Sequence, residues 1–189
     1  MSDTMIELTT PLSEKTARGL RAGDRVRLSG IVYTGRDAAH ARLIELLEKG
    51  GELPFPPEGA VIYYVGPAPA KPPRPIGSAG PTTSYRMDPY TPPLLKVGVR
   101  GMIGKGLRGE KVVEAMKKYG AVYFAAIGGA AALISKSIIS AEVIAYEDLG
   151  PEAIRRLEVK DFPLVVAGDS HGRSAYEDGK REYRTLETV

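Results

Sequence analysis

Three cationic side chains lie in glycine-rich or proline-rich segments that also carry hydroxyl groups. Arg36 lies in "YTGRDAAH", Arg86 and Thr82 lie in "GPTTSYRMDPYTPP", and Lys105 lies in "MIGKG". An arginine can bind a carboxylate through two parallel hydrogen bonds, and a lysine binds one as a point charge. A threonine hydroxyl can donate a hydrogen bond to an oxyanion or relay a proton. Together these residues predict a site for a small dicarboxylate bound at both ends.

Each of these segments also has a simpler interpretation. Thr82 suits a turn, and Arg36 could pair on the surface with Asp37 or Glu45. Arg36 also directly precedes a predicted helix, where its guanidinium and the free helix N–H groups could converge on one carboxylate. His40 lies one turn into that helix on an alanine-rich face, so we expect it to be packed or hydrogen-bonded rather than catalytic.

Residues 104–109, "GKGLRG", match the dinucleotide pattern G-x-G-x-x-G between a predicted strand and a predicted helix. That motif also requires an acidic residue about 20 positions later to bind the ribose. The corresponding region, "VYFAAIGGA", has none. A tight turn with close helix packing is a better interpretation, and an anion site with Lys105 at a helix N-terminus is better still. A stand-alone nucleotide- or phosphate-binding module remains the alternative.

The composition is that of one ordinary globular domain. The 189 residues are 43% hydrophobic and 26% charged, with a net charge of +3 and no dense Lys/Arg block, which argues against a nucleic-acid partner. There is no cysteine, so this chain alone cannot hold an iron–sulfur cluster, and the two histidines have no metal-ligand spacing. No apolar run approaches the roughly 18 residues of a membrane span. Without a signal-peptide pattern at the start, we expect a cytoplasmic protein.

The element pattern predicts a mixed α/β architecture. We expect short strands up to residue 34, with a bulge at Gly30, a helix over 36–51 capped by Asp37, and a strand over 60–65. The run from residue 94 predicts a strand that leads into the glycine-rich turn at 104–109, and a helix over 110–119 and a buried strand over 121–127 follow. The rest predicts a short helix, a strand, another short helix, a strand over 164–168 and a polar tail. "GDSHGR", residues 168–173, predicts a hairpin turn, with no hydrolase role for Ser170 or His171.

Residues 66–93 differ from the rest in composition, because nine of the 15 prolines lie there. A long irregular segment inside a compact chain is usually functional or disordered. The specific polar residues in it favour a functional loop.

The segments "YTGRDAAH", "GPTTSYRMDPYTP", "MIGKG", "AIGGAAAL" and "VKDFP" occur in an order that resembles the beta subunit of two-subunit class I fumarate hydratases. The same module forms the C-terminal part of single-chain versions, and the beta subunit of L(+)-tartrate dehydratase is similar. The resemblance extends from about Met5 to Asp178. It implies a swivelling β/β/α domain with a mixed sheet, a single domain over 1–189, with 66–93 as an active-site loop.

The resemblance also implies an activity and a partner. The activity is that of a hydro-lyase that interconverts (S)-malate and fumarate plus water, or alternatively an L(+)-tartrate dehydratase. A separate alpha subunit would hold a [4Fe-4S] cluster through three cysteines, in a hetero-oligomer of two alpha–beta pairs.

Four residues of this chain match the family's substrate-contacting positions: Arg36, Thr82, Arg86 and Lys105. For the dehydration of malate, our hypothesis is that the Thr82 hydroxyl relays the proton when Lys105 or a carboxylate of the partner activates it. Tyr85 stands where many relatives have glycine, and its bulk could alter how the loop closes.

Overall fold

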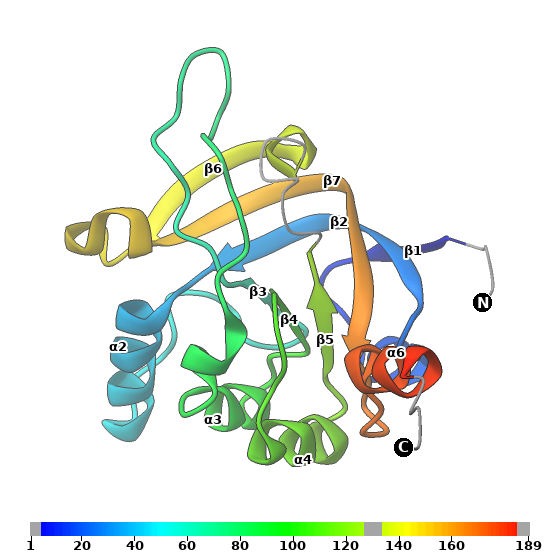
Figure 1. The fold of residues 1–189 in the computed structure, drawn as a ribbon. Helices are drawn as coiled ribbons and strands as arrows, with labels where there is room; N and C mark the ends of the chain where they lie inside the picture. The colour runs from blue at the N-terminus through cyan, green and yellow to red at the C-terminus, as the bar shows by residue number, and fades with distance from the viewer. Residues whose placement is uncertain (1–4, 127–133, 185–189) are drawn as a thin grey trace.

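The computed structural model describes residues 5–126 and 134–184, which form a mixed α/β domain (Figure 1). The motif "AIGGAAAL" and the short helix expected near it therefore lie largely outside the described residues. The strands and helices are β1 (Ile6–Thr9), α1 (Glu14–Gly19), β2 (Arg25–Thr34), α2 (Asp37–Glu48), β3 (Val61–Tyr63), η1 (Ser84–Met87), α3 (Thr91–Lys96), β4 (Gly101–Gly104), α4 (Glu110–Tyr119), β5 (Val122–Ala125), η2 (Ser135–Ser137), β6 (Ile138–Ala145), η3 (Glu147–Glu152), β7 (Ile154–Gly168) and α6 (Ala175–Tyr183).

The strands form a sheet that closes on itself. Its order is β1-β2-β3-β4-β5-β7-β6, and β2 also pairs with β7, so the five strands from β2 to β5 and β7 form a barrel-like ring. The pairs from β1 to β5 are parallel, whereas β7 runs antiparallel to β2, β5 and β6. Because β2, β3 and β4 are parallel neighbours, the segments that follow them leave the same edge of the sheet.

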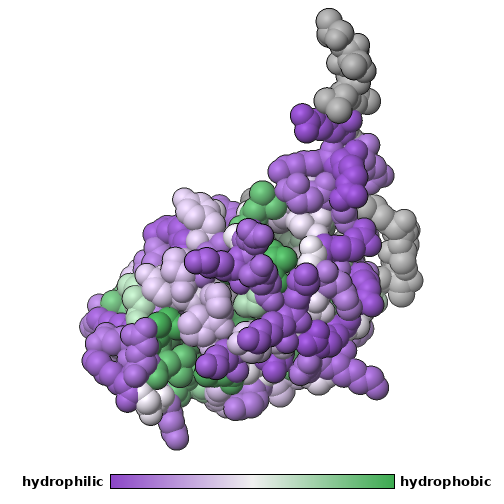
Figure 2. All heavy atoms as spheres, turned by 90° about the horizontal axis from the view of Figure 1, so that it is seen from below, coloured by the Kyte–Doolittle hydropathy of each residue, from purple (hydrophilic) through white to green (hydrophobic). Residues whose placement is uncertain are grey.

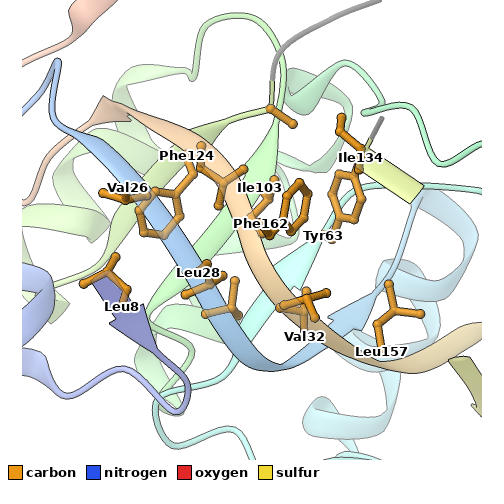
Figure 3. Packing of buried hydrophobic residues seen from close by; sticks show 14 of the residues in the cluster. Leu8, Val26, Leu28, Val32, Tyr63, Ile103, Phe124, Ile134, Leu157 and Phe162 are labelled. Carbon is orange, nitrogen blue, oxygen red and sulfur yellow. The ribbon is translucent and has the colours of Figure 1, made fainter. Parts of the chain in front are cut away.

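The interior of this ring holds one of two apolar clusters. Val26, Leu28 and Val32 of β2 are buried there with aromatic side chains from β3, β5 and β7, as Figure 3 shows. The register with β7 shifts between Leu28 and Gly30, which confirms the expected bulge. Ile31 and Tyr33 pack on the other side of the strand, so β2 contributes to both clusters.

The second cluster lies between the sheet and the helices. Helix α4 buries Val112, Ala115 and Met116 on one face and ends at Gly120, whose φ of 64° is the left-handed conformation that favours glycine at a helix C-terminus. Viewed from below, from the side of α3 and α4, the surface is mostly hydrophilic, with only small hydrophobic areas (Figure 2). Within the described residues, no helix is long and apolar enough to cross a bilayer.

The structure confirms α4 within its expected bounds and corrects four local expectations. The first helical residue of α2 is Asp37, and Arg36 takes the N-cap position without a side-chain cap bond. The strand expected before the glycine-rich turn is present as β4 but begins only at Gly101, and the run from residue 94 is instead the end of α3, whose first turn contains prolines. The short helix expected before residue 164 is largely strand, because β7 already begins at Ile154. The polar tail forms α6.

The proline-rich segment leaves the sheet after β3 and projects from the body before it returns at η1 (Figure 1). Near its base, the Ala68 N–H donates to the Ser78 carbonyl at 2.9 Å, and the Gly77 N–H donates to the Ala68 carbonyl at 3.1 Å. The range 66–93 also contains η1 and the start of α3, so its second half is helical in part.

Candidate functional site

Three of the four residues expected to form the site follow the carboxyl ends of neighbouring parallel strands. Arg36 follows β2, Thr82 lies in the segment after β3, and Lys105 comes directly after β4. The Thr82 N–H donates to the Tyr64 carbonyl at 2.7 Å, and the Lys105 N–H donates to the Thr82 carbonyl at 3.3 Å. The loop therefore passes between the extensions of β3 and β4, at the sheet edge where α/β proteins bind ligands.

Ser84 fixes this passage of the loop against β4. Its N–H donates to the Lys105 carbonyl at 2.9 Å, and its buried hydroxyl lies 2.9 Å from the Tyr123 hydroxyl. A Cβ at residue 104 would lie 2.0 Å from the Ser84 Oγ, so only glycine allows this approach. The backbones of Thr82 and Lys105 are thus held in a fixed relation.

Arg36 shares a carboxylate with the N-terminus of α2, as the sequence suggested, but the carboxylate belongs to the protein. Its guanidinium pairs with Glu152 Oε1 at 3.2 Å, and the Ala38 N–H donates to Glu152 Oε2 at 3.1 Å. Arg36 therefore pairs with Glu152 and with neither Asp37 nor Glu45.

Arg86 reaches the same helix terminus from η1. Its guanidinium donates to Asp37, the first residue of α2 and the neighbour of Arg36. Lys105 is exposed and makes no ion pair with any described residue. These contacts bring Arg36, Arg86, Thr82 and Lys105 to one edge of the sheet. Their surroundings are polar and partly open to solvent.

His40 supports this edge from the interior, as expected. It is fully buried, its Nδ1 lies 2.9 Å from the Arg36 carbonyl, and its ring packs edge-on against Tyr64 with the ring centres 5.3 Å apart. Burial lowers the pKa of His40 from 6.5 to about 4, because the charged imidazolium would lose its hydration. A neutral histidine therefore anchors the residue that begins α2.

The G-x-G-x-x-G segment has a structural role here. The Gly109 N–H, at the N-cap of α4, donates to Asp88 Oδ2 at 2.6 Å, and Arg108 Nε donates to Asp88 Oδ1 at 2.7 Å. A side chain of the protein thus occupies the anion position at this helix. The expectation that Lys105 lies at a helix N-terminus is wrong, since it follows β4 and α4 begins at Glu110.

Arg108 belongs to the site's surroundings, and no sequence pattern singles it out. Only 3% of its side chain is exposed, and it donates to Asp88, to the Thr91 hydroxyl at 2.7 Å and to the Tyr64 hydroxyl at 3.3 Å. Its guanidinium also lies 5.3 Å from the Tyr64 ring centre and 5.2 Å from that of Tyr123. This network ties the proline-rich loop to α4. Its partners are distant in sequence, and no local pattern connects them.

The "GDSHGR" segment forms the expected turn. Gly168 and Ser174 form an antiparallel bridge, and Asp169 Oδ1 accepts from the N–H groups of His171 at 2.9 Å and Arg173 at 3.0 Å. These contacts stabilise the turn.

The residues of this chain do not fit an iron–sulfur cluster. The sequence contains no cysteine. Over residues 5–126 and 134–184, no group of three or more histidine, aspartate or glutamate side chains could hold a metal ion. The side chains at the candidate site are instead suited to binding anions.

Comparisons with known proteins show the family of this chain. Residues 1–179 match the family model described as Fumarase C-terminus. A Geobacillus stearothermophilus protein, provisionally named a class I fumarate hydratase, is 42% identical over 92% of this chain and 34% of its own length. A Methanocaldococcus jannaschii protein, provisionally named L(+)-tartrate dehydratase subunit beta, is 40% identical over 93% of each chain.

The anaerobic class I fumarate hydratase of Escherichia coli is 40% identical over 91% of this chain and 32% of its own length. This chain thus spans about a third of the two fumarate hydratases but almost all of the M. jannaschii protein.

Proposed function

The chain belongs to the fumarase C-terminus family, and we propose that it is the beta subunit of a hydro-lyase that interconverts (S)-malate and fumarate plus water. The observation that carries this proposal is the meeting of Arg36, Arg86, Lys105 and Thr82 where parallel strands end. Cations and a hydroxyl from separate segments suit a substrate with a carboxylate at each end.

In this proposal the cationic side chains bind the two carboxylates. Dehydration of malate removes a proton from a carbon next to a carboxylate, so negative charge grows on that carboxylate as the proton leaves. Pre-positioned arginine and lysine side chains stabilise this charge. The Thr82 hydroxyl moves the proton when Lys105 or a carboxylate of the partner activates it.

The partner in this proposal is an alpha subunit that carries the [4Fe-4S] cluster. The absence of cysteine here and the M. jannaschii relative named as a subunit beta both support a divided enzyme. We further propose that residues 1–189 form one swivelling domain, that 66–93 act as its active-site loop, and that two alpha–beta pairs assemble.

A second candidate activity is that of L(+)-tartrate dehydratase. It is favoured by the M. jannaschii relative, which matches this chain over 93% of both lengths and is named as a tartrate dehydratase subunit. Tartrate is also a four-carbon dicarboxylate and would use the same cations. Tyr85, with 64% of its surface exposed beside Arg86, is well placed to influence this choice.

Reconstitution tests the proposal. The chain is mixed anaerobically with an iron–sulfur alpha subunit and assayed with malate, fumarate and tartrate. Activity that requires both chains supports the proposal, and its absence with all three substrates contradicts it.

Thr82→Val tests the proton-transfer role and should lower kcat far more than it lowers assembly. Thr83→Val measures the cost of altering the loop itself, so equal losses in both variants would remove that role from Thr82.

A further inference from the structure

Glu152 is the one carboxylate that contacts both Arg36 and the N-terminus of α2 among the described residues. Its Oε1 lies 3.2 Å from the Arg36 guanidinium, and its Oε2 accepts from the Ala38 N–H at 3.1 Å. Both side chains are largely covered, with 24% of each exposed. Each oxygen of Glu152 therefore has a defined donor, and Arg36 is held from one side.

The turn that carries Glu152 is firmly fixed. The guanidinium of Arg155 donates to the carbonyls of Gly150 and Pro151 at 3.0 Å and to that of Ala153 at 3.2 Å. The Thr34 hydroxyl also donates to the Ala153 carbonyl at 3.2 Å and accepts from the Arg155 N–H at 2.9 Å. Since the carbonyls on both sides of Glu152 are bound, its carboxylate is presented from a rigid backbone.

Gly66 lies close to both Arg36 and the turn that carries Glu152. A Cβ at this position would lie 3.0 Å from Arg36 Nη1, 3.2 Å from its Cδ and 3.5 Å from the Pro151 carbonyl. The Arg36 Nε is itself buried, with no acceptor among the described residues. The guanidinium thus pairs with Glu152 and has Gly66 in close contact with its side chain.

We propose that Glu152 is a positioning residue, which holds the Arg36 guanidinium in place to receive a substrate carboxylate. This inference rests on the proposed function for the identity of the substrate. A long side chain that is already ordered loses less conformational freedom when the ligand binds. Without Glu152, the substrate itself must order Arg36. The loss falls on binding of the ground state and the transition state alike, so it appears in KM more than in kcat.

The kinetic test uses Glu152→Gln in the reconstituted two-subunit enzyme. We expect KM for malate and fumarate to rise about tenfold, with kcat within about twofold. The matched control is Asp148→Asn. Asp148 also joins η3 to α2 through a two-bond pair with Arg42, at 2.8 and 2.6 Å, but it does not touch Arg36. An equal rise in KM in both variants would overturn the proposal, because attachment of the turn would then explain the effect. A fall in KM with Glu152→Gln would also overturn it, since Glu152 would then compete with the substrate.

A second variant disturbs Arg36 without changing any charge. In Gly66→Ala, the new methyl group presses on the Arg36 side chain, because it would lie 3.0 Å from Nη1 and 3.2 Å from Cδ. A KM rise of a few-fold with kcat retained is the expected result. An unchanged KM in both Gly66→Ala and Glu152→Gln would show that the position of Arg36 does not limit binding.

A readout that needs neither substrate nor partner separates this inference from the proposed function. Exchange of the Arg36 Nε–H with water, followed by NMR on the full chain, should be slow in the natural chain and in Asp148→Asn. Glu152→Gln should accelerate it. Unaltered exchange in Glu152→Gln overturns the positioning role even if the enzyme is active. Inactivity of the natural reconstituted pair contradicts the proposed function even if the exchange behaves as expected.

Discussion

The N-termini of α2 and α4 have the same arrangement of an arginine and a carboxylate, but the two arginines differ in exposure and in the number of their partners. In each, an arginine lies just before the helix, and a distant carboxylate binds both that arginine and a backbone N–H at the helix start. At α4, Arg108 is 3% exposed and has further partners in hydroxyl groups and aromatic rings. At α2, Arg36 is 24% exposed and its Nε has no acceptor among the described residues. The enclosed arginine with all of its partners serves the fold, whereas the more exposed arginine is the one that can meet a ligand.

Replacing Arg108 by methionine should have the largest effect on stability. The change leaves Asp88 with a charge that its surroundings no longer neutralise, and removal of one partner from a buried pair costs about 3–5 kcal/mol. Denaturant unfolding of the full chain measures the loss. The matched variant Arg36→Met should cost less than Arg108→Met, because 24% of the Arg36 side chain is exposed against 3% of Arg108. Similar losses in both variants would abolish the distinction between the two helix termini.

Catalytic activity, unlike stability, should depend more on Arg36 than on Arg108. Arg36→Lys in the reconstituted enzyme should lower kcat/KM about 100-fold or more, because a lysine keeps the charge but loses the planar set of donors. Steady-state assays with malate and fumarate measure this. Arg42→Lys, on the exposed side of the same helix, is the control and should retain activity. A retained kcat/KM in Arg36→Lys would remove Arg36 from substrate binding.

The free energy of unfolding at acidic pH should depend on His40, the buried histidine that supports the N-terminus of α2. The folded chain keeps His40 neutral down to about pH 4, whereas the unfolded chain binds a proton near pH 6.5. The stability that depends on a neutral His40 is thus complete above pH 6.5. It is lost as the pH falls toward 4, by about 3 kcal/mol in total. Unfolding measured between pH 7 and 4 should lose this slope in His40→Gln but not in His171→Gln, and an unchanged slope in His40→Gln would contradict the assignment.

The smallest effect is expected at Asp37, which binds Arg86 across a solvent-exposed contact. Asp37→Asn should change the free energy of unfolding by less than about 1 kcal/mol, because exposed pairs contribute little. Thermal or denaturant unfolding gives the value. A loss as large as that of Arg108→Met would mean that the loop and α2 are coupled more tightly than this exposure indicates.

The sequence was informative where a structural rule acts locally. The apolar spacing and Gly120 gave α4 its bounds, and Gly30 marked the bulge in β2. The first part of β7 was misread, because Ile154 and Leu157 have a helix-like spacing. In the structure, the pairing of β6 with β7 is irregular there, which breaks the strict alternation of a strand.

For the site, the sequence indicated the cations but not the carboxylates that accompany them. Arg36 and Arg86 stand in segments of distinctive composition, so their types and neighbours were informative. Glu152 and Asp88 lie in ordinary helical turns, far along the chain from Arg36 and Arg108. The pairing of β2 with β7 brings Glu152 to Arg36, and the parallel pairing of β3 with β4 brings Asp88 to Arg108.

The long strand β7 links substitutions in the sheet to the position of the turn that carries Glu152. It completes the ring through β2 and β5, and its first residue, Ile154, comes just after the turn that carries Glu152. A substitution in its buried middle, remote from any ligand, would shift that turn relative to α2. Ligand affinity and the free energy of unfolding would therefore change together in such variants. Selection for either property would limit which residues this strand can accept.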